Sequence, residues 1–141
     1  MSVVLNPYLH FKDVARDAMT FYHQVLGGEL TVSTYGDFNP AEGSATRDRI
    51  MHAMLKTPGG LVLMGGDIPD HVDYRPSAGF SVSLSGPFED GEELHRYWDG
   101  LAAGGTIAMP LATAPWGDEF GMVTDRFGVD WMVNIAGKTA G

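Results

Sequence analysis

The chain has 141 residues, of which 44% are hydrophobic and 19% charged, and it contains no cysteine. This length indicates one domain, or two very small ones that share a core. The lack of cysteine excludes a disulfide scaffold, thiolate metal ligands and a cysteine nucleophile. The formal net charge of −9 disfavours binding to the phosphate backbone of nucleic acids. No apolar run approaches the roughly 20 residues that span a bilayer, and no signal peptide is apparent. We therefore expect a cytoplasmic protein with neither nucleic acid nor membrane as a partner.

The first third of the chain predicts a strand, a helix and a second strand. Apolar and polar residues alternate toward the end of Val3–Phe11, which indicates a strand. Apolar residues at helical spacing follow from Asp13, whose side chain we expect to cap the helix, and Gly27-Gly28 ends it. Leu30–Tyr35 is rich in β-branched and aromatic residues and predicts a strand, and Gly36–Asp48 predicts a polar loop.

A hairpin closes the first half of the chain. Its strands are predicted over Arg49–Thr57 and Leu61–Met64, and Pro58-Gly59-Gly60 supplies the turn between them. The next segment, Gly65–Ala78, is rich in turn-forming residues and is interpreted as a linker.

The same order then starts again. A strand is predicted over Gly79–Ser85, a helix over Glu89–Ala103 and a strand over Thr106–Thr113. A second hairpin follows, with strands over Gly121–Thr124 and Val129–Ile135. The chain thus predicts strand, helix and three strands, twice over.

This repeat predicts an α+β fold of two βαβββ modules. Two such modules side by side form a cupped, mostly antiparallel sheet with the helices on its outer face, and the cup is a natural ligand site. We expect one domain over residues 1–141, with module one at about 1–66, a linker at about 67–77 and module two at about 78–137. A homodimer is expected because the open sheet edges need covering.

Five short stretches, spread over most of the chain, carry a resemblance to a known family. They are Asn6–Phe11, Ala18–Tyr22 with the following Gly27-Gly28, Met51–Ala53, Trp116–Gly121 and Asp125–Trp131. In these the chain resembles the vicinal oxygen chelate superfamily of glyoxalase, bleomycin-resistance and extradiol-dioxygenase proteins, and within it the PhnB-like group. The resemblance implies paired βαβββ modules around a cupped sheet, as a single glyoxalase-like domain that usually forms homodimers.

The resemblance also implies a divalent metal, held by His and Glu side chains in the cup. None of the matching positions carries a histidine or a carboxylate. They are Asn6 or Pro7, Met54, Gly79 or Phe80, and Met132. We therefore expect no metal and no other cofactor. PhnB-like proteins often carry a methyltransferase label. No glycine-rich segment of this chain follows a strand and opens a helix as a nucleotide-type site requires, and no segment is identified that could hold S-adenosylmethionine, so the sequence does not support that label.

Two histidines are candidate site residues. Alternation places His52 on the strand face of Ile50 and Met54, where it is interpreted as a general base, a hydrogen-bonding group or a single metal ligand. His10 shares a face with Tyr8 and approaches His52 if the two strands pair. The structural alternatives are a hydrogen-bonded histidine in a polar patch for His52 and an exposed strand end for His10.

Aromatic and methionine side chains supply the remaining candidates. Trp116 and Phe120 flank a glycine-containing loop and offer flat apolar area, either to a ligand or to a sheet edge or dimer contact. Flexible thioethers suit irregular apolar ligands. Met54 and Met132 are assigned to the cavity, whereas Met51 is assigned to the core.

The preferred hypothesis is a metal-independent protein that binds a small apolar or aromatic molecule. Its ligand-binding residues would be Tyr8, His10, His52, Met54, Trp116, Phe120 and Met132, with His52 as the catalytic candidate if a reaction occurs. One alternative is a metal-dependent lyase, isomerase or dioxygenase with a displaced site on His10 and His52. Another is a degenerate structural module without a ligand.

Overall fold

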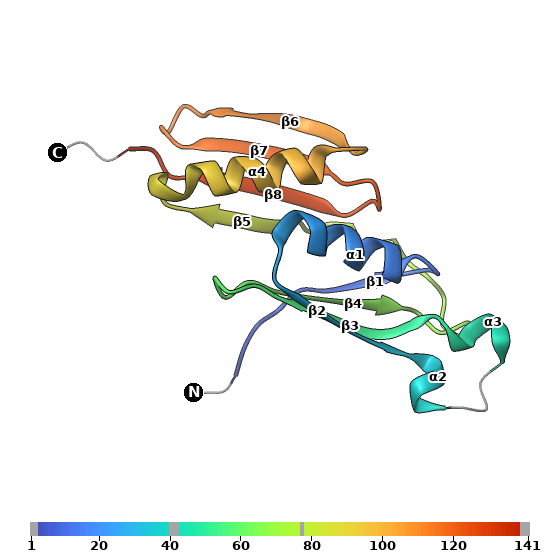
Figure 1. Ribbon diagram of the computed structural model, residues 1–141. Coiled ribbons are helices and arrows are strands. Elements are labelled where there is room, and N and C mark those ends of the chain that lie inside the picture. The colour runs from blue at the N-terminus through green and yellow to red at the C-terminus, as the bar shows by residue number, and fades with distance from the viewer. Residues whose placement is uncertain (1–2, 40–42, 77, 139–141) are drawn as a thin grey trace. The chain divides into compact units, whose positions relative to one another are not determined.

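The computed structural model describes residues 3–39, 43–76 and 78–138. The chain divides into two compact units, Met1–Ser77 and Ala78–Gly141. In each unit a helix of 12 residues accompanies a four-stranded sheet (Figure 1). Positions 40–42 of the predicted polar loop and position 77 of the predicted linker lie outside the described residues. The single domain over all 141 residues stays a prediction.

The sheet of the first unit has the strand order β1-β4-β3-β2, with β1 parallel to β4 and the other pairs antiparallel. Its elements are β1 (Tyr8–Phe11), α1 (Ala15–Leu26), β2 (Glu29–Thr34), the short helices α2 (Tyr35–Phe38) and α3 (Ser44–Arg47), β3 (Ile50–Lys56) and β4 (Val62–Asp67).

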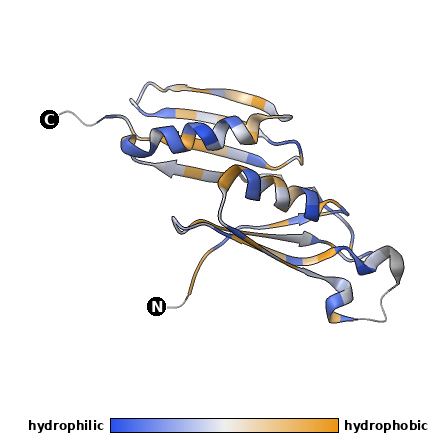
Figure 2. Ribbon diagram, viewed as in Figure 1, coloured by the Kyte–Doolittle hydropathy of each residue, from blue (hydrophilic) through white to orange (hydrophobic). Residues whose placement is uncertain are grey.

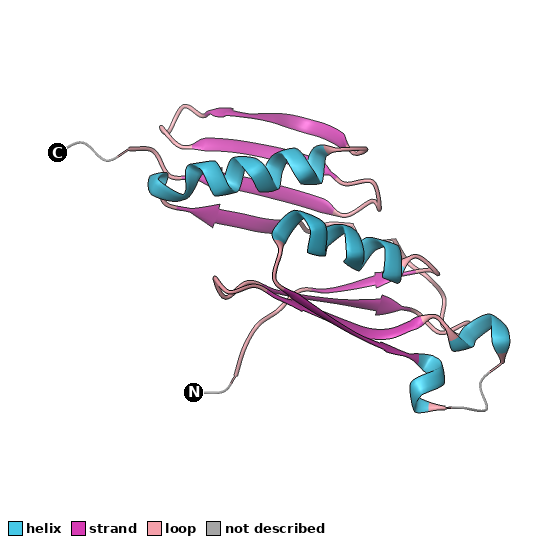
Figure 3. Cartoon of the chain, in the orientation of Figure 1, coloured by secondary structure: helices cyan, strands magenta, loops and turns pink. Residues whose placement is uncertain are grey.

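The second unit repeats this topology, with the strand order β5-β8-β7-β6 and a parallel β5–β8 pair (Figure 3). Its elements are β5 (Val82–Gly86), the 3₁₀ turn η1 (Phe88–Asp90), α4 (Gly91–Ala102), β6 (Thr106–Thr113), β7 (Glu119–Thr124) and β8 (Asp130–Ile135). The predicted α+β fold of two βαβββ modules is thereby confirmed.

Each long helix covers one face of its own sheet. Hydrophilic and hydrophobic residues alternate along α1 and α4 (Figure 2), as expected for helices with one buried side. In the first unit the side chain of Met19 on α1 reaches the backbone of Gly65 on β4. In the second unit Trp98 on α4 reaches Gly121 on β7. Within the described ranges, no helix is long and apolar enough to cross a membrane.

The core of each unit comes from the strand positions that face its helix. In the first unit the fully buried strand residues include Leu9, Phe11, Ala53 and Leu55. In the second they include Val123, Trp131, Val133 and Ile135. Alternate strand positions therefore point to the opposite face, which the unit's own helix does not cover. We call these surfaces the open face of the first unit and the open face of the second unit.

The glycine pairs that end the long helices make the same contact in both units. A Cβ atom on Gly28 would lie 2.3 Å from the backbone oxygen of Lys56. A Cβ atom on Gly105 would lie 2.3 Å from the backbone oxygen of Thr124. Glycine is required at both positions because the chain leaving each helix passes directly against a strand. The two units therefore repeat not only the order of their elements but also the close contact between the helix-ending glycine and a strand.

The N-terminal strand and the cap of α1 differ from the predictions. The strand begins at Tyr8 rather than Val3, and the side chains at positions 3–5 are exposed. Asp13 does not cap the helix, because its backbone is left-handed (φ 67°) and its carboxylate pairs with the Nε of Arg49 at 2.8 Å. The N–H of Ala15 instead donates to the carboxylate of Asp67, at 2.9 Å.

Asp67 also shows that the predicted linker starts too early. Residues 65–67 belong to β4, and the polar loop before β3 contains α2 and α3. The buried Asp67 carboxylate accepts hydrogen bonds from the N–H groups of Ala15 and Ile50, at 2.9 and 3.0 Å. Its backbone oxygen accepts one from the hydroxyl of Tyr35, at 2.6 Å. A residue of apparent linker composition thus joins four elements of the first unit.

Candidate functional site

A β-bulge in β3 sets the orientation of His52. Ser33 pairs with His52 but Thr34 pairs with Ile50, so Met51 is an extra residue without a partner on β2. The bulge turns Ile50 into the core, where it is fully buried, while His52 stays half-buried on the other face. The predicted common face of Ile50 and His52 is therefore wrong, since strict alternation does not pass through a bulge. Met51 was predicted to lie in the core, but it is only half-buried at this bulge.

Tyr8 and His52 meet on the open face of the first unit. The Tyr8 hydroxyl donates a hydrogen bond to the backbone oxygen of Met51, at 3.2 Å. The Nδ1 of His52 lies 3.4 Å from the Tyr8 hydroxyl, and the two rings stack with their centroids 5.6 Å apart. The ring of His10 also contacts Tyr8, with a centroid distance of 5.1 Å. Tyr8, His10 and His52 thus lie together as expected, although β1 and β3 do not pair with each other and β4 lies between them.

Burial further favours the protonated form of the Tyr8 hydroxyl. Desolvation raises the pKa of Tyr8 above its usual value of 10.0. The hydroxyl is therefore a neutral donor over the whole physiological range of pH.

Gly66 makes room for this arrangement. It pairs with His10 across the parallel β1–β4 ladder. A Cβ atom at this position would lie 2.7 Å from the backbone oxygen of Met51 and 2.9 Å from the hydroxyl of Tyr8. Any larger residue would therefore displace the bulge or the tyrosine.

We expect Gly66→Ala to lower the free energy of unfolding by about 1–3 kcal/mol, because the added methyl group overlaps two polar atoms in a packed site. Urea denaturation followed by circular dichroism measures the change. The matched control is Gly59→Ala in the β3–β4 turn, where the nearest atom to an added Cβ is 4.0 Å away. Equal stability of the two variants would contradict the tight packing at Gly66.

Two methionines extend the open face of the first unit beside Tyr8. Met64 is the neighbour of Tyr8 on β4, and Met54 is the neighbour of Met64 on β3. Both side chains are half-buried. Met64 is not among the candidates identified from the sequence, although its even spacing from Gly66 in one strand places both on one face.

The open face of the second unit carries a corresponding pair. Met132 on β8 is the neighbour of Met122 on β7, and both are half-buried. The two hairpins close in the same way, with Thr57 N–H bonded to the oxygen of Leu61 and Asp125 N–H to that of Val129. Counted from these closures, Met132 corresponds to Met64 and Met122 to Met54. Both units thus present a methionine pair at the same place in their sheets.

Trp116 and Phe120 lie together at the end of the second unit's open face. Their ring centroids are 5.9 Å apart at an interplanar angle of 60°, and 63% of Trp116 is exposed. The intervening Asp118 holds the loop, because its carboxylate accepts hydrogen bonds from Asn134 Nδ2 and from the N–H of Gly137, at 3.1 and 2.9 Å. These bonds lower the pKa of Asp118, so it anchors the loop as an anion.

The positions that the resemblance assigns to metal ligands do not fit a divalent cation. Met54 and Met132 offer thioethers, which suit soft ions rather than the borderline and hard cations bound by imidazole and carboxylate. Among the residues that the structure describes, no three His, Asp or Glu side chains gather as a metal site requires.

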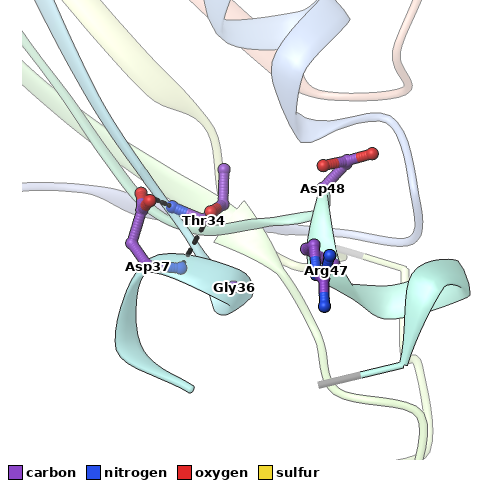
Figure 4. A pocket seen from close by; sticks show the side chains of 5 residues that line it. All are labelled: Thr34, Gly36, Asp37, Arg47 and Asp48. Atoms are coloured by element: carbon purple, nitrogen blue, oxygen red, sulfur yellow. Dashed lines mark hydrogen bonds between the residues drawn. The ribbon is translucent and has the colours of Figure 1, made fainter. Parts of the chain in front are cut away.

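A polar pocket of about 340 Å³ lies between the end of β2 and the short helices α2 and α3 (Figure 4). A capping box at the start of α2 shapes it, with Asp37 N–H bonded to Thr34 Oγ1 and Thr34 N–H bonded to the Asp37 carboxylate. The lining residues are Thr34, Gly36, Asp37, Arg47 and Asp48. None of these was singled out from the sequence, because nothing in the loop has a recognisable spacing.

The sequence of the chain matches the model of a known protein family. The model of the Glyoxalase/Bleomycin resistance protein/Dioxygenase superfamily matches residues 5–133. The chain belongs to this superfamily. The resemblance stated from short sequence stretches is thereby confirmed.

Individual relatives are similar over nearly their whole length. The chain is 34% identical to Protein YjdN of Escherichia coli (strain K12), over 93% of this chain and 94% of that one. Protein PA1353 from Pseudomonas aeruginosa has a TM-score of 0.84 and 39% identity, covering 97% of this chain and all of its own (100%). A PhnB protein from Bacillus cereus, described as a putative 3-demethylubiquinone-9 3-methyltransferase, has a TM-score of 0.68 and 25% identity, covering 95% of this chain and 100% of its own. This neighbour supports the predicted PhnB-like group.

Proposed function

We propose that this superfamily member binds a small apolar or aromatic molecule and needs no divalent metal to do so. The observation that carries the proposal is the open face of the first unit, where two polar side chains stand among half-buried methionines. Ligand sites typically combine a mainly apolar surface with a few fixed polar groups that orient the ligand.

The methionines supply the apolar surface. Met54 and Met64 are flexible and polarisable, so they adapt to ligands of irregular outline. On the second unit's open face, Met132 and the ring pair of Trp116 and Phe120 offer a further apolar surface with aromatic character. These residues suit an apolar or aromatic ligand better than a highly charged one.

Tyr8 and His52 supply the polar groups. Tyr8 is fixed by its bond to the bulge carbonyl of Met51, and His52 is fixed by its stacking on Tyr8. His10 adds a second imidazole at the exposed edge of the cluster. We assign His52 the role of polar contact and, if a reaction occurs, of proton acceptor.

A screen of small molecules by thermal shift tests the proposal. A ligand at 100 times its dissociation constant is expected to raise the free energy of unfolding by about 2.7 kcal/mol, because it binds only the folded state. Met54→Ala is expected to weaken a bound aromatic compound about fivefold through lost apolar contact. Leu61→Ala, at the β3–β4 turn, is the matched control and should leave the affinity unchanged. Stabilisation by no compound would contradict the proposal and favour a structural module.

Metal analysis tests the metal-independent part separately. We expect purified protein to contain far less than one equivalent of nickel, zinc, manganese or iron, and divalent cations to leave the melting temperature unchanged. One tightly bound equivalent that is lost in His52→Ala and His10→Ala would contradict this part and support the alternative of a metal enzyme with a displaced site.

A further inference from the structure

The cluster at Tyr8 has one hydroxyl proton and two neighbours that compete for it. The backbone oxygen of Met51 can only accept a hydrogen bond, so the contact at 3.2 Å requires the Tyr8 hydroxyl to donate. The contact of 3.4 Å between Tyr8 and His52 Nδ1 then requires the imidazole to be the donor. Both contacts are satisfied together only when Nδ1 carries the proton.

The surrounding structure holds the hydroxyl in this direction. A bulge leaves its extra residue outside the regular ladder, so the oxygen of Met51 gains a partner in Tyr8. Gly66 leaves the space in which this bond forms, since a side chain there would strike both atoms. The stacked ring of Tyr8 also restricts rotation of the His52 ring.

We propose that neutral His52 is held as the Nδ1–H tautomer, so that its Nε2 is an unprotonated hydrogen-bond acceptor, and that the ligand is an aromatic molecule with an O–H or N–H group that donates to Nε2. The inference rests on the proposed function and narrows its ligand class. In a histidine the hydrogen bond of one ring nitrogen determines the state of the other. A molecule lacking a donor would leave Nε2 without a partner and would lose affinity for that reason.

The tautomer is measurable without a ligand. Long-range ¹H–¹⁵N correlation spectra at pH 8 are expected to show His52 protonated at Nδ1 and unprotonated at Nε2. Tyr8→Phe retains the ring but removes the hydroxyl, so the Nδ1–H population of His52 is expected to fall. A predominantly Nε2-protonated His52 in the wild-type protein would overturn the inference.

His23 provides a control in the same spectrum. Its Nε2 lies 2.9 Å from the backbone oxygen of Gly28, which can only accept. His23 is therefore expected to be the opposite tautomer, protonated at Nε2, and to be unchanged in Tyr8→Phe. A change at His23 that matches the change at His52 would indicate a general loss of structure. The result for Tyr8→Phe would then no longer support the inferred tautomer of His52.

The ligand class is tested with 2-naphthol and its methyl ether, 2-methoxynaphthalene. Wild-type protein is expected to bind 2-naphthol about three- to tenfold more tightly, the range for one hydrogen bond, and His52→Phe is expected to lose this preference. Equal binding of both probes would overturn the inferred ligand class but support the proposed function. Binding of neither would count against the proposed function itself, and the spectra would still decide the tautomer.

Discussion

Trp131→Ala is expected to lower the free energy of unfolding by about 3–5 kcal/mol, the usual cost of emptying a large buried aromatic site. Trp131 is 1% exposed on β8, and its indole N–H donates to the carboxylate of Asp125 at 2.9 Å. That carboxylate is buried and also accepts from the N–H groups of Phe127 and Val129. The substitution therefore removes both packing and one bond to a buried acid, and urea denaturation measures the sum.

Two further tryptophan variants separate these contributions. Trp131→Phe retains most of the ring but loses the indole N–H, and we expect it to cost about 1–3 kcal/mol. Trp116→Ala removes a side chain that is 63% exposed, and we expect its effect to stay within about 0.5 kcal/mol. If Trp131→Ala were no more harmful than Trp116→Ala, β8 would not form the core of the second unit.

Asp67→Ala is expected to cost about 2–5 kcal/mol, because two buried backbone N–H groups lose their acceptor at once. The groups belong to Ala15 at the start of α1 and Ile50 at the start of β3. Amide hydrogen exchange is expected to accelerate at both residues, in addition to the fall in overall stability seen by denaturation.

Asp73→Ala is the matched control for Asp67, since Asp73 is exposed in the segment after β4. We expect it to change stability by no more than about 0.5 kcal/mol. Asp67→Asn keeps one oxygen as an acceptor but turns an amide N–H₂ toward the other backbone donor, so most of the loss should remain. Wild-type stability in Asp67→Ala would show that the two N–H groups find another acceptor.

The main elements of the fold were predictable from local patterns. Helical spacing of apolar residues located α1 and α4, and Thr106–Thr113 was predicted with the bounds that β6 has. The double order of elements also predicted two modules of one topology. Some errors lie at element ends, as at Val3 and Gly65, where neighbouring residues leave the choice between strand and coil open. Others are short helices that no periodicity marks, since α2 and α3 lie in the segment predicted as a loop.

The candidate site was predictable only in part. Tyr8, His10 and His52 were each identified from residue type and strand position, and they do lie together. The bulge at Met51 was not predictable, because it depends on how β2 pairs with β3. The role of Gly66 was likewise hidden, since its neighbours come from two other strands.

The sequence by itself therefore determined the kind and order of the strands and of the two long helices, the duplication and the superfamily, because these depend on patterns within each segment or on the ordered set of segments. The tertiary structure alone decided which atoms meet. The hydroxyl of Tyr8 meets a ring 44 positions away, and the carboxylate of Asp67 caps a helix that begins 52 positions earlier. Such contacts depend on strand register and on the space left by a glycine, and no local pattern of residue types specifies either one.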